Sequence, residues 1–417
     1  MSVAPTPRPG LRPLEDALAD LLNDTAALAG VQQVPTFEAD GRVLAQDLVS
    51  ALDVPGHDNT SMDGYAVRVA DLVQANGAPL VVSQRIPAGH FGEPLQAGTV
   101  ARIFTGAPLP AGADAVVMQE EAEVQDDGRV VFKSLPAVGQ WIRRQGEDVQ
   151  KGSAVLRAGT RLGPAELGLA ASIGFAELPV APRVRVALLS TGDELVMPGS
   201  VAPTDMKPGA IYNSNRFFLR ALLQRFGCEV SDLGIVPDQR EATVAALQEA
   251  AQRHDLILTS GGVSVGEEDH IKPAVQQLGA LNLWQIGMKP GKPFAFGHVG
   301  PAHFIGLPGN PVSSFVTFLL LVRPFLLKLQ GVPVDALTAL PQPLHLPAHF
   351  SLPKGDKRRE FLRARRNAQG GLDLFANQSS GVLTSAVWAD GLIDNPPGQA
   401  IAHGDLVRFI PFSDLFA

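Results

Sequence analysis

The stretch "DLILTSGGVSVGEED", residues 255–269, determines how the middle of this chain is expected to fold. It begins with the apolar run of a buried strand, which ends at the paired glycines Gly261 and Gly262. Glycines flanked by the hydroxyls of Ser260 and Ser264 let backbone N–H groups converge on an anion, which is typical of a phosphate site. A plain glycine turn is the simpler alternative. The stretch then ends in three acidic residues, which is unexpected after an anion-binding loop.

Strand-like and helix-like runs alternate on both sides of this stretch. Strands are expected at residues 183–191, 228–236, 255–260, 282–288 and 302–307, and helices at 213–227, 239–254, 267–279 and 313–331. The short connections between them predict a mostly parallel sheet with helices on both faces, which is a three-layer α/β domain. In such a sheet, ligands bind at the carboxyl ends of the strands.

Motifs rich in glycine, proline and polar residues follow these strands and predict one shared rim. They are "STGDEL" (190–195), "VPD" (236–238), "MKPGKP" (288–293) and "GLPGNPVS" (306–313). Prolines beside Lys289 and Lys292 make that segment stiff, so its lysines are candidate anion ligands, with solvated surface lysines as the alternative. Pro308 and Pro311 fix the backbone path of the last motif, which either shapes the site or only caps the apolar helix.

Three acidic residues on this rim are candidate catalytic groups or metal ligands: Glu194, Asp238 and Asp269. Carboxylates held close together repel one another unless a cation lies between them. Mg²⁺ takes one or two carboxylates together with phosphate oxygens of a substrate. A phosphate on the glycine turn and a Mg²⁺ on the acids would therefore explain both halves of the opening stretch. The alternatives are an ordinary solvated rim and, for "TGDE", a simple Asp-capped turn.

The remaining chain is expected to form smaller domains. Residues 51–140 carry short β-type runs separated by Gly, Pro and Asp, which predicts an inserted β-rich domain. Residues 1–50 and 141–182 are expected to form an N-terminal linker domain of helices and extended segments. Residues 333–417 again show β-type runs and predict a β-barrel-like domain. We therefore expect a multi-domain α/β plus β protein whose α/β domain spans 183–332.

Composition and charge exclude several classes of function. The 417-residue chain has a formal net charge of −8, which argues against a general nucleic-acid binder. The N-terminus lacks the apolar core of a signal peptide, and Arg323 and Pro324 interrupt the apolar run at 313–331 before it reaches spanning length. We therefore expect a cytoplasmic protein that does not bind membranes. Cys228 is the only cysteine, so we expect no internal disulfide and a buried thiol.

Three further motifs lie outside the α/β region: "DVPGHDNTSMDGYAVR" (53–68), "RIFTGAPLP" (102–110) and "REFLRAR" (359–365). The first carries Asp63 among turn formers and is either a functional loop or an ordered interdomain loop. The second places Thr105 at a strand end before a proline turn. The third predicts a strand with Arg363 and Arg365 on one face, as an anion clamp or as solvated side chains.

Together these motifs closely resemble the molybdopterin molybdenumtransferase family of bacterial MoeA type, and also the E domain of gephyrin. The matching motifs run in order along nearly the whole chain, and they include "DNTSMDGYA", "RIFTGAPLPAGADAVVMQE", "IRRQGED", "ALLSTGDEL", "IYNSN", "TSGGVSVGEED", "MKPGKPFAFG" and "GLPGNPVS". "SGGVSVG" or "TGDE" alone would indicate only a shared molybdopterin-binding α/β domain. The upstream "DNTSMDGYA" extends the resemblance to the full family.

The resemblance implies that the enzyme binds adenylylated molybdopterin, accepts molybdate, cleaves the adenylate and releases molybdenum cofactor, with Mg²⁺ required. It implies an elongated homodimer with the site between the α/β domain of one protomer and the β-module loops of the other. Positions that match residues important for the family's function are Asp63, Thr105, Asp148, Glu194, Asp238 and Asp269. Positions that resemble its molybdate pocket are Lys289, Lys292, Pro293, Arg363 and Ser380, and Pro308 and Pro311 match its proline loop.

We expect the stretch from Ser260 to Gly262, with Ser264, to hold the pterin or phosphate end of the substrate, and Glu194 with Asp269 to hold Mg²⁺. The sequence departs from the family pattern at Gln285, where some relatives place a further lysine, and "NQSSGVL" around Ser380 matches loosely. A separate molybdopterin adenylyltransferase is expected to supply the substrate, and maturation partners of molybdoenzymes to receive the product.

Two alternative functions remain: a non-catalytic dimeric scaffold or carrier of molybdopterin, and a molybdopterin adenylyltransferase. The acids at 63, 194 and 269 favour an enzyme over a scaffold, because a scaffold would not need them. The extra β-rich domains and "DNTSMDGYA" argue against the adenylyltransferase.

Overall fold

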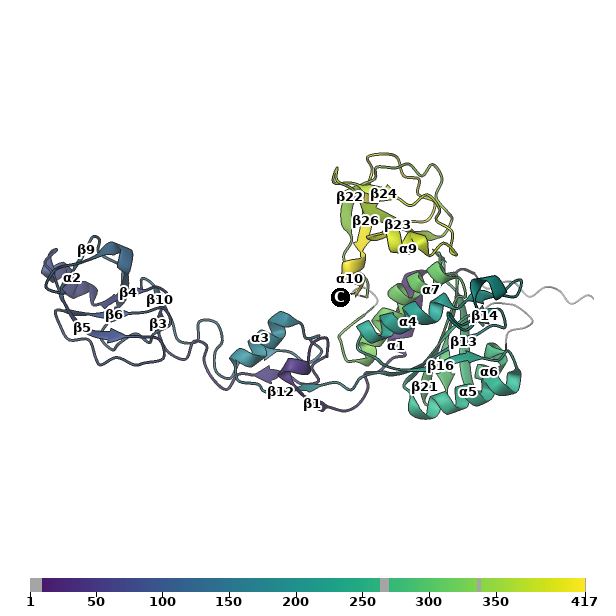
Figure 1. The fold of residues 1–417 in the computed structure, drawn as a ribbon, viewed down its shortest axis with the longest axis horizontal. Coiled ribbons are helices and arrows are strands. Elements are labelled where there is room, and N and C mark those ends of the chain that lie inside the picture. The colour runs from purple at the N-terminus through teal and green to yellow at the C-terminus, as the bar shows by residue number, and fades with distance from the viewer. Residues whose placement is uncertain (1–9, 263–269, 336–338, 417) are drawn as a thin grey trace, which may run out of the picture.

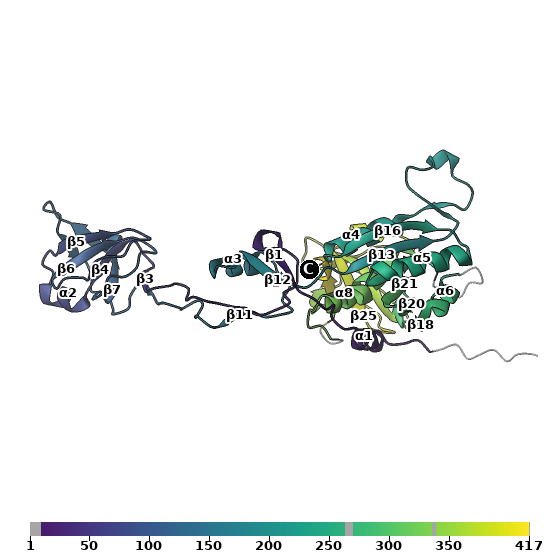
Figure 2. The same ribbon diagram turned by 90° about the horizontal axis from the view of Figure 1, so that it is seen from below.

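The computed structural model describes residues 10–262, 270–335 and 339–416. The chain is strongly elongated, as Figure 1 and Figure 2 show from two directions. A β-rich unit, called the β-module here (residues 59–132), stands at one end. A slender linker unit joins it to an α/β unit, against which a second β-rich unit, the C-terminal module (residues 344–411), is packed.

The α/β unit is built on a six-stranded sheet in the order β16-β13-β17-β21-β20-β18. Its strands are β13 (Arg185–Thr191), β16 (Glu229–Val236), β17 (Leu256–Ser260), β18 (Gly279–Gln285), β20 (Pro293–Val299) and β21 (Ala302–Leu307). The first four in spatial order are parallel, and β20 is antiparallel to both of its neighbours. The mostly parallel sheet is therefore confirmed. Strand β20, however, was not among the expected strands.

Helices cover both faces of this sheet, so the predicted three layers are present. They are α4 (Ser214–Arg225), α5 (Arg240–Arg253), α6 (Ile271–Leu278), α7 (Pro311–Thr317) and α8 (Arg323–Leu329). Ala187 and Leu189 of β13 join the core beneath α5 and α6, whereas Val186 and Leu188 join the core beneath α4, α7 and α8. Because successive side chains of a strand point to opposite faces, one continuous apolar run fills both cores.

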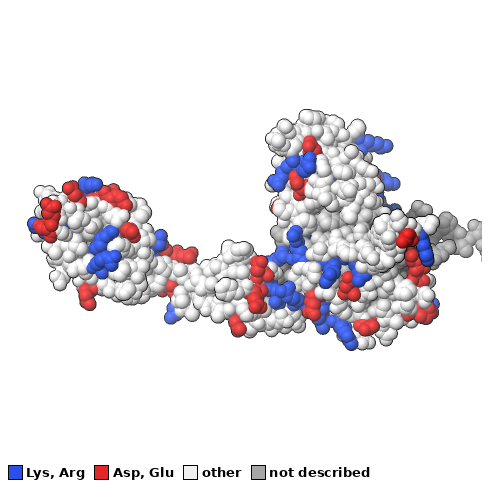
Figure 3. Space-filling view, viewed as in Figure 1, with Lys and Arg blue, Asp and Glu red and all other residues white. Residues whose placement is uncertain are grey.

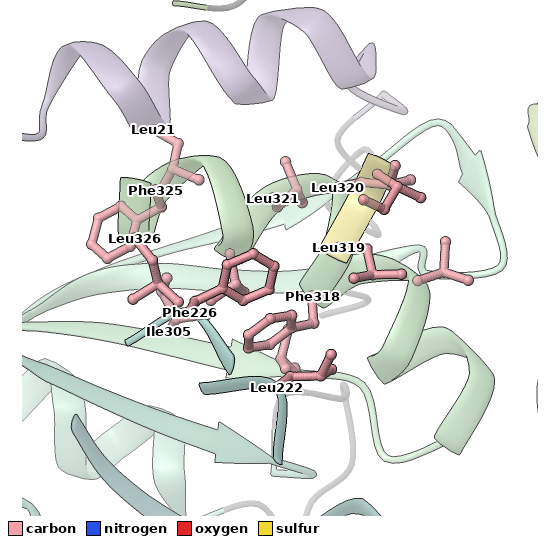
Figure 4. Packing of buried hydrophobic residues seen from close by; sticks show 14 of the residues in the cluster. Leu21, Leu222, Phe226, Ile305, Phe318, Leu319, Leu320, Leu321, Phe325 and Leu326 are labelled. Atoms are coloured by element: carbon pink, nitrogen blue, oxygen red, sulfur yellow. The ribbon is translucent and has the colours of Figure 1, made fainter. Parts of the chain in front are cut away.

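The most apolar segment of the chain is a core helix. A π-helical turn at Phe318–Val322 joins α7 to α8, so that the helix runs from Pro311 to Leu329. It is long and apolar enough to cross a membrane, yet 89% of its most apolar window is buried inside the protein. Figure 4 shows its side chains packed around Phe226, and Leu21 from α1 (Leu14–Asn23) reaches the same core.

Cys228 also belongs to this core, as expected. Burial raises the pKa of its thiol to about 12, so the residue packs as a small apolar group and is unreactive at neutral pH.

The linker unit consists of two chain segments that run in opposite directions side by side. Strand β1 (Gln32–Pro35) pairs with β12 (Glu177–Val180), and β2 (Leu48–Val49) pairs with β11 (Ala154–Leu156), both antiparallel. Helix α3 (Pro164–Ser172) contributes to a small core that contains residues from both segments. The chain therefore leaves the α/β unit along one segment and returns along the other.

The β-module holds a four-stranded sheet in the order β5-β6-β4-β7. Its elements are β3 (Asn59–Thr60), β4 (Gly64–Val67), α2 (Val69–Ala75), β5 (Val81–Ile86), β6 (Thr99–Ile103), β7 (Ala115–Met118), β8 (Ala122–Val124) and β9 (Val130–Phe132), and β10 (Ile142–Arg143) pairs with β3. The connection from β3 into β4 carries Asp63, and the end of β6 leads directly into Thr105.

The C-terminal module is a sheet in the order β19-β23-β25-β26-β22, with β24 paired to β23. Its elements are β22 (Leu344–Pro347), β23 (Arg359–Arg366), β24 (Leu372–Leu374), α9 (Thr384–Trp388), β25 (Gly391–Asn395) and β26 (Leu406–Pro411), with β19 (Met288–Lys289) added at one edge of the sheet and α10 (Phe412–Phe416) following β26. Strand β19 comes from the segment between β18 and β20 of the α/β unit. The lysine motif at 288–293 therefore lies where the two units join.

Candidate functional site

A pocket opens at the carboxyl ends of strands β13, β17 and β21, where a ligand is expected in an α/β sheet. Its volume of about 630 Å³ suits a small-molecule ligand. Predicted site residues that line it are Glu194, Ser260, Gly261, Pro293, Pro308 and Pro311. The structure therefore brings the motifs at 190–195, 259–262 and 306–313 to one place.

The glycine turn after β17 can be formed only by glycines. Gly261 and Gly262 have φ angles of +93° and +69°, a region that side chains disfavour. A Cβ atom on Gly262 would lie 2.7 Å from Ile271 Cγ1 and 3.0 Å from Thr191 Oγ1. The Gly261 N–H donates to the carbonyl oxygen of Leu307 at 3.0 Å. The turn is thus fixed against the ends of both neighbouring strands.

Two helices begin at the pocket, which favours an anionic ligand. Ser214 of α4 and Pro311 of α7 both line it. The first turn of a helix carries the positive end of the helix dipole, which attracts an anion. Asn213 caps α4 by accepting a hydrogen bond from Arg216 N at 3.2 Å.

Two asparagines have site roles that the sequence analysis did not assign. Asn215 Nδ2 donates to Ser260 Oγ and to the carbonyl oxygen of Gly309, both at 2.7 Å, and so joins the glycine turn to the proline loop. Asn213 lines the pocket, and its buried Nδ2 has no hydrogen-bond partner in the described part of the chain. The motif "IYNSN" was the available signal, but it was interpreted only as a match to the family.

Only one of the predicted acidic residues is found among the residues that line this pocket. Within residues 10–262, 270–335 and 339–416, Glu194 is the only acidic residue that lines it. Asp238 follows the end of β16 and is not among the lining residues. Ser264 and Asp269 lie outside the described residues. Among those that are described, no cluster of three His, Cys, Asp or Glu side chains could hold a metal ion.

The two predicted lysines face away from this pocket. Lys289 Nζ donates to Glu360 Oε1 at 3.1 Å and lies 3.3 Å from Asp356 Oδ2. Lys292 lines a second pocket, whereas the adjacent Pro293 lines the first. Residues 292 and 293 therefore form a wall that the two pockets share.

Arg363 is fully buried rather than solvated, with 1% of its surface exposed. Its Nη1 donates to Phe361 O and its Nε to Ser385 Oγ, both at 3.1 Å, and its Nη2 donates to Ser379 O at 3.4 Å. No carboxylate in the described part of the chain pairs with it. Burial lowers the pKa of the guanidinium to about 10, so the group stays charged at neutral pH.

This buried cation lies directly beneath the loop that closes the pocket. Ser379 accepts its hydrogen bond, and Gly381, two residues on, lines the pocket. Between them, the carbonyl oxygen of Ser380 accepts from Val312 N of α7 at 2.9 Å. A cation buried without an acidic partner is costly, and an anion in the adjacent pocket would offset that cost.

Asp63 and Thr105 form a compact pair on the β-module. Asp63 Oδ1 accepts from Thr105 N at 2.8 Å and from Thr105 Oγ1 at 2.7 Å. The backbone N–H first, and then the hydroxyl, lower the pKa of Asp63, so its carboxylate is ionised at neutral pH. Asp148 lies in the segment that joins the β-module to the linker unit, where its N–H donates to Val54 O at 3.0 Å.

These three residues are far from the pocket within one chain. Figure 1 and Figure 2 both place the β-module at the opposite end of the molecule from β13 and β17. Figure 3 shows acidic and basic side chains mixed over this face of the molecule rather than gathered into one basic field. The structure therefore brings one group of predicted residues together and leaves another group apart.

Comparison with known proteins identifies the relatives of this chain. Residues 12–174 match the family described as the MoeA N-terminal region (domain I and II). Residues 187–328 match the probable molybdopterin binding domain, and residues 345–412 match the MoeA C-terminal region (domain IV). The chain belongs to the molybdopterin molybdenumtransferase family.

Individual relatives agree with this assignment. A molybdopterin molybdenumtransferase of Haemophilus influenzae is 45% identical over 76% of this chain and 78% of its own length. One from Synechococcus elongatus is 38% identical over 92% of this chain and 95% of its own. The crystal structure of a molybdopterin biosynthesis MoeA protein from Pyrococcus horikoshii is 29% identical and superposes with a TM-score of 0.83, covering 96% of this chain and 100% of that one.

The family membership gives the coarse function. The protein is an enzyme of molybdenum cofactor biosynthesis that acts on molybdopterin and inserts molybdenum.

Proposed function

We propose that this enzyme takes molybdenum from molybdate, inserts it into adenylylated molybdopterin and cleaves the adenylate. Water would accept the adenylyl group, so that the phosphoanhydride yields AMP and the phosphate of the pterin. The observation that carries this proposal is one pocket with a glycine turn, two helix N-termini and a carboxylate, bordered by a wall that bears cations. Such a site suits a phosphate-containing ligand next to an oxyanion.

The glycine turn and the proline loop would hold the substrate. Ser260 and Gly261 line the pocket, Gly262 completes the same turn, and Asn215 keeps Ser260 against the proline loop. Ser264 belongs to the same proposed cradle. Because Pro308 and Pro311 have no N–H and a fixed φ angle, the loop keeps its shape when the ligand is absent.

Mg²⁺ is part of the proposal, and the described residues fit it in part. Glu194 supplies one carboxylate at the pocket, and Thr191 and Ser260 supply hydroxyls. Mg²⁺ accepts one or two carboxylates when phosphate oxygens complete its shell. We propose Glu194 and Asp269 as its ligands, with Asp238 as a further acidic group. When bound, the ion would neutralise charge on the phosphoanhydride as a Lewis acid.

A second copy of the chain would complete the site. Asp63 is ionised, and its Oδ1 is fixed by Thr105, which is the arrangement of a group that orients an attacking water or substrate hydroxyl. It has no partner in its own chain's pocket because the β-module lies at the other end of the molecule. We therefore propose a homodimer in which Asp63, Thr105 and Asp148 of one protomer serve the pocket of the other.

Molybdate would bind at the wall between the two pockets. Lys292 and Pro293 form this wall, Lys289 lies in the segment that leads into it, and Arg363 adds a buried charge under the loop that carries Ser380. Lys289 is held by two carboxylates here, so its role would be to position the wall as well as to attract the anion.

AMP release tests the proposed reaction. Purified protein is mixed with adenylylated molybdopterin and Mg²⁺, with and without molybdate, and both AMP and reconstitution of an apo-molybdoenzyme are followed. We expect AMP to appear only with molybdate, together with active molybdoenzyme. Binding of the pterin without cleavage would instead support the scaffold or carrier. Formation of adenylylated molybdopterin from ATP would support the adenylyltransferase.

The cellular setting follows from the same reaction. A separate adenylyltransferase would deliver the substrate, and molybdoenzyme maturation factors would receive the product. We propose that these exchanges occur in the cytoplasm.

A further inference from the structure

The second pocket, on the far side of the wall at residues 292 and 293, has a volume of about 770 Å³. We propose that it binds a tetrahedral oxyanion through Lys292, Lys354 and Lys357. The inference rests on the proposed function and deepens it, because it names Lys354 and Lys357 as further residues that bind an anionic substrate group.

The three lysines are not neutralised by their surroundings. Lys292, Lys354 and Lys357 all line this pocket and are exposed. The ammonium group of none of them makes a hydrogen bond or ion pair in the described part of the chain. The two nearby carboxylates, Asp356 and Glu360, are already paired with other cations.

Arg358 and Lys289 neutralise those two carboxylates. Arg358 Nε and Nη2 donate to the two oxygens of Asp356, each at 3.0 Å. Lys289 Nζ lies 3.3 Å from Asp356 Oδ2 and 3.1 Å from Glu360 Oε1. The Arg358 side chain is the main reason that the pKa of Asp356 lies far below its usual range. The lysines of the pocket are therefore left with positive charge in excess.

The loop that carries Lys354 and Lys357 is held rigidly. A Cβ atom on Gly355 would lie 2.4 Å from the carbonyl oxygen of Gln399, so only glycine allows this close packing. The N–H of Gly398 donates to Asp356 O at 2.6 Å, and Asp356 N donates to Glu360 Oε2 at 3.0 Å. These contacts fix the backbone of the loop, so the Cα atoms of its two lysines are held beside the pocket before a ligand binds.

The opposite wall is fixed as well. Arg12 N donates to Gln285 O at 2.8 Å, and Gly287 N donates to Arg12 O at 2.7 Å. Ile286 N donates to Lys292 O at 2.7 Å, which fixes the backbone of Lys292 in the wall between the two pockets. Backbone hydrogen bonds therefore fix both sides of this open pocket.

The position of this pocket indicates what its ligand does. Lys292 borders it, and the next residue, Pro293, borders the pocket that holds Glu194 and Ser260. An oxyanion bound here is therefore next to the reaction site without occupying it. Two ligands share this chemistry: free molybdate waiting to enter, and a phosphate group of the pterin substrate.

The test compares two charge-matched double variants of the full chain. Lys354→Gln with Lys357→Gln removes two pocket cations, and Lys133→Gln with Lys151→Gln removes two lysines that line neither pocket. Molybdate binding is measured by equilibrium dialysis without pterin, and the KM values for molybdate and for adenylylated molybdopterin are measured by AMP release. Thermal melts check that both variants fold.

If free molybdate binds here, the dissociation constant and the KM for molybdate rise about tenfold or more in the pocket variant only, and kcat at saturating molybdate does not change. The expected size follows because each charge-assisted hydrogen bond contributes roughly a tenfold factor in affinity. If the pterin phosphate binds here, only the KM for adenylylated molybdopterin rises. Unchanged values in a folded pocket variant overturn the inference. A wild-type protein that binds molybdate through these lysines but releases no AMP would refute the proposed function and leave the anion site standing.

Discussion

Replacing Arg363 with methionine should separate function from stability. Arg363 is 1% exposed and pairs with no carboxylate in the described part of the chain. Burial lowers its pKa from 12.5 to about 10. A shift of this size means that holding the charged form in place costs about 3 kcal/mol. Methionine fills a similar volume without that cost.

The gain is opposed by lost hydrogen bonds. The two bonds at 3.1 Å, to Phe361 O and Ser385 Oγ, together contribute about 3 kcal/mol, since a bond to a charged group contributes about 1.5 kcal/mol at the low end. The two acceptors keep other roles, because Ser385 Oγ also donates to Val382 O and Phe361 belongs to a paired strand. We expect the free energy of unfolding to change by less than about 1.5 kcal/mol.

Activity should respond differently. Without the buried charge, the loop at 379–381 no longer favours an anion in the pocket, and the KM for molybdate should rise about tenfold or more. The assay combines urea unfolding with AMP release over a range of molybdate concentrations. Arg365→Met is the control, because Arg365 stacks on Trp388 at 4.5 Å on the exposed end of the same strand. If Arg363→Met loses more than about 3 kcal/mol and its activity falls only in proportion to unfolding, the residue is structural.

Three further predictions concern other parts of the molecule. Gly262→Ala should lower the free energy of unfolding by about 1–2 kcal/mol because of its positive φ angle, and it should also weaken pterin binding because its Cβ would meet Ile271 and Thr191. Gly174→Ala is the control, since Gly174 has φ +91° and open space around it. Thermal melts and pterin titrations should show the stability loss alone for this control. Gln285→Lys adds a cation to the second pocket and should tighten molybdate binding about two- to fivefold in equilibrium dialysis, with no change if the pocket binds no anion. Burial first, and His298 second, lower the pKa of His303 to about 4. Its neutral form is favoured in the fold, so stability is complete above pH 6.5 and falls by about 2 kcal/mol as pH drops toward 4, after allowance for solvent screening. His303→Phe should flatten this part of the urea-unfolding profile, and an unchanged slope between pH 7 and pH 4.5 would contradict the assignment.

The main architecture could be predicted because the α/β unit follows simple periodic rules. Its inner parallel strands β13, β17 and β21 are mostly apolar, buried runs, and its loops carry the glycines and prolines that strand ends require. Strand β20 escaped prediction because its residues "PFAFGHV" follow a proline turn and join β21 through only two residues, Gly300 and Pro301. A hairpin at this point reverses the direction that alternating strands and helices imply.

The candidate site could be predicted only in part. Residues on strand ends, such as Glu194 and Ser260, fall into one pocket because the topology of the sheet places them there. The lysine motif divides between two pockets because β19 leaves the α/β sheet and pairs with β23 of the C-terminal module. Nothing in a local pattern reveals such a long-range pairing, or that Arg363 would be buried while Arg365 is exposed.

The central claim is that the site is built from two copies of the chain, and mixed dimers test it most directly. Asp63→Asn removes the β-module carboxylate, and Glu194→Gln removes the pocket carboxylate. Each variant alone should release little AMP. After the two are unfolded, mixed in equal amounts and refolded, random pairing in a symmetric dimer should restore about a quarter of wild-type activity, because half of the dimers carry one intact site of two. A refolded mixture that stays as inactive as either variant would contradict a shared site.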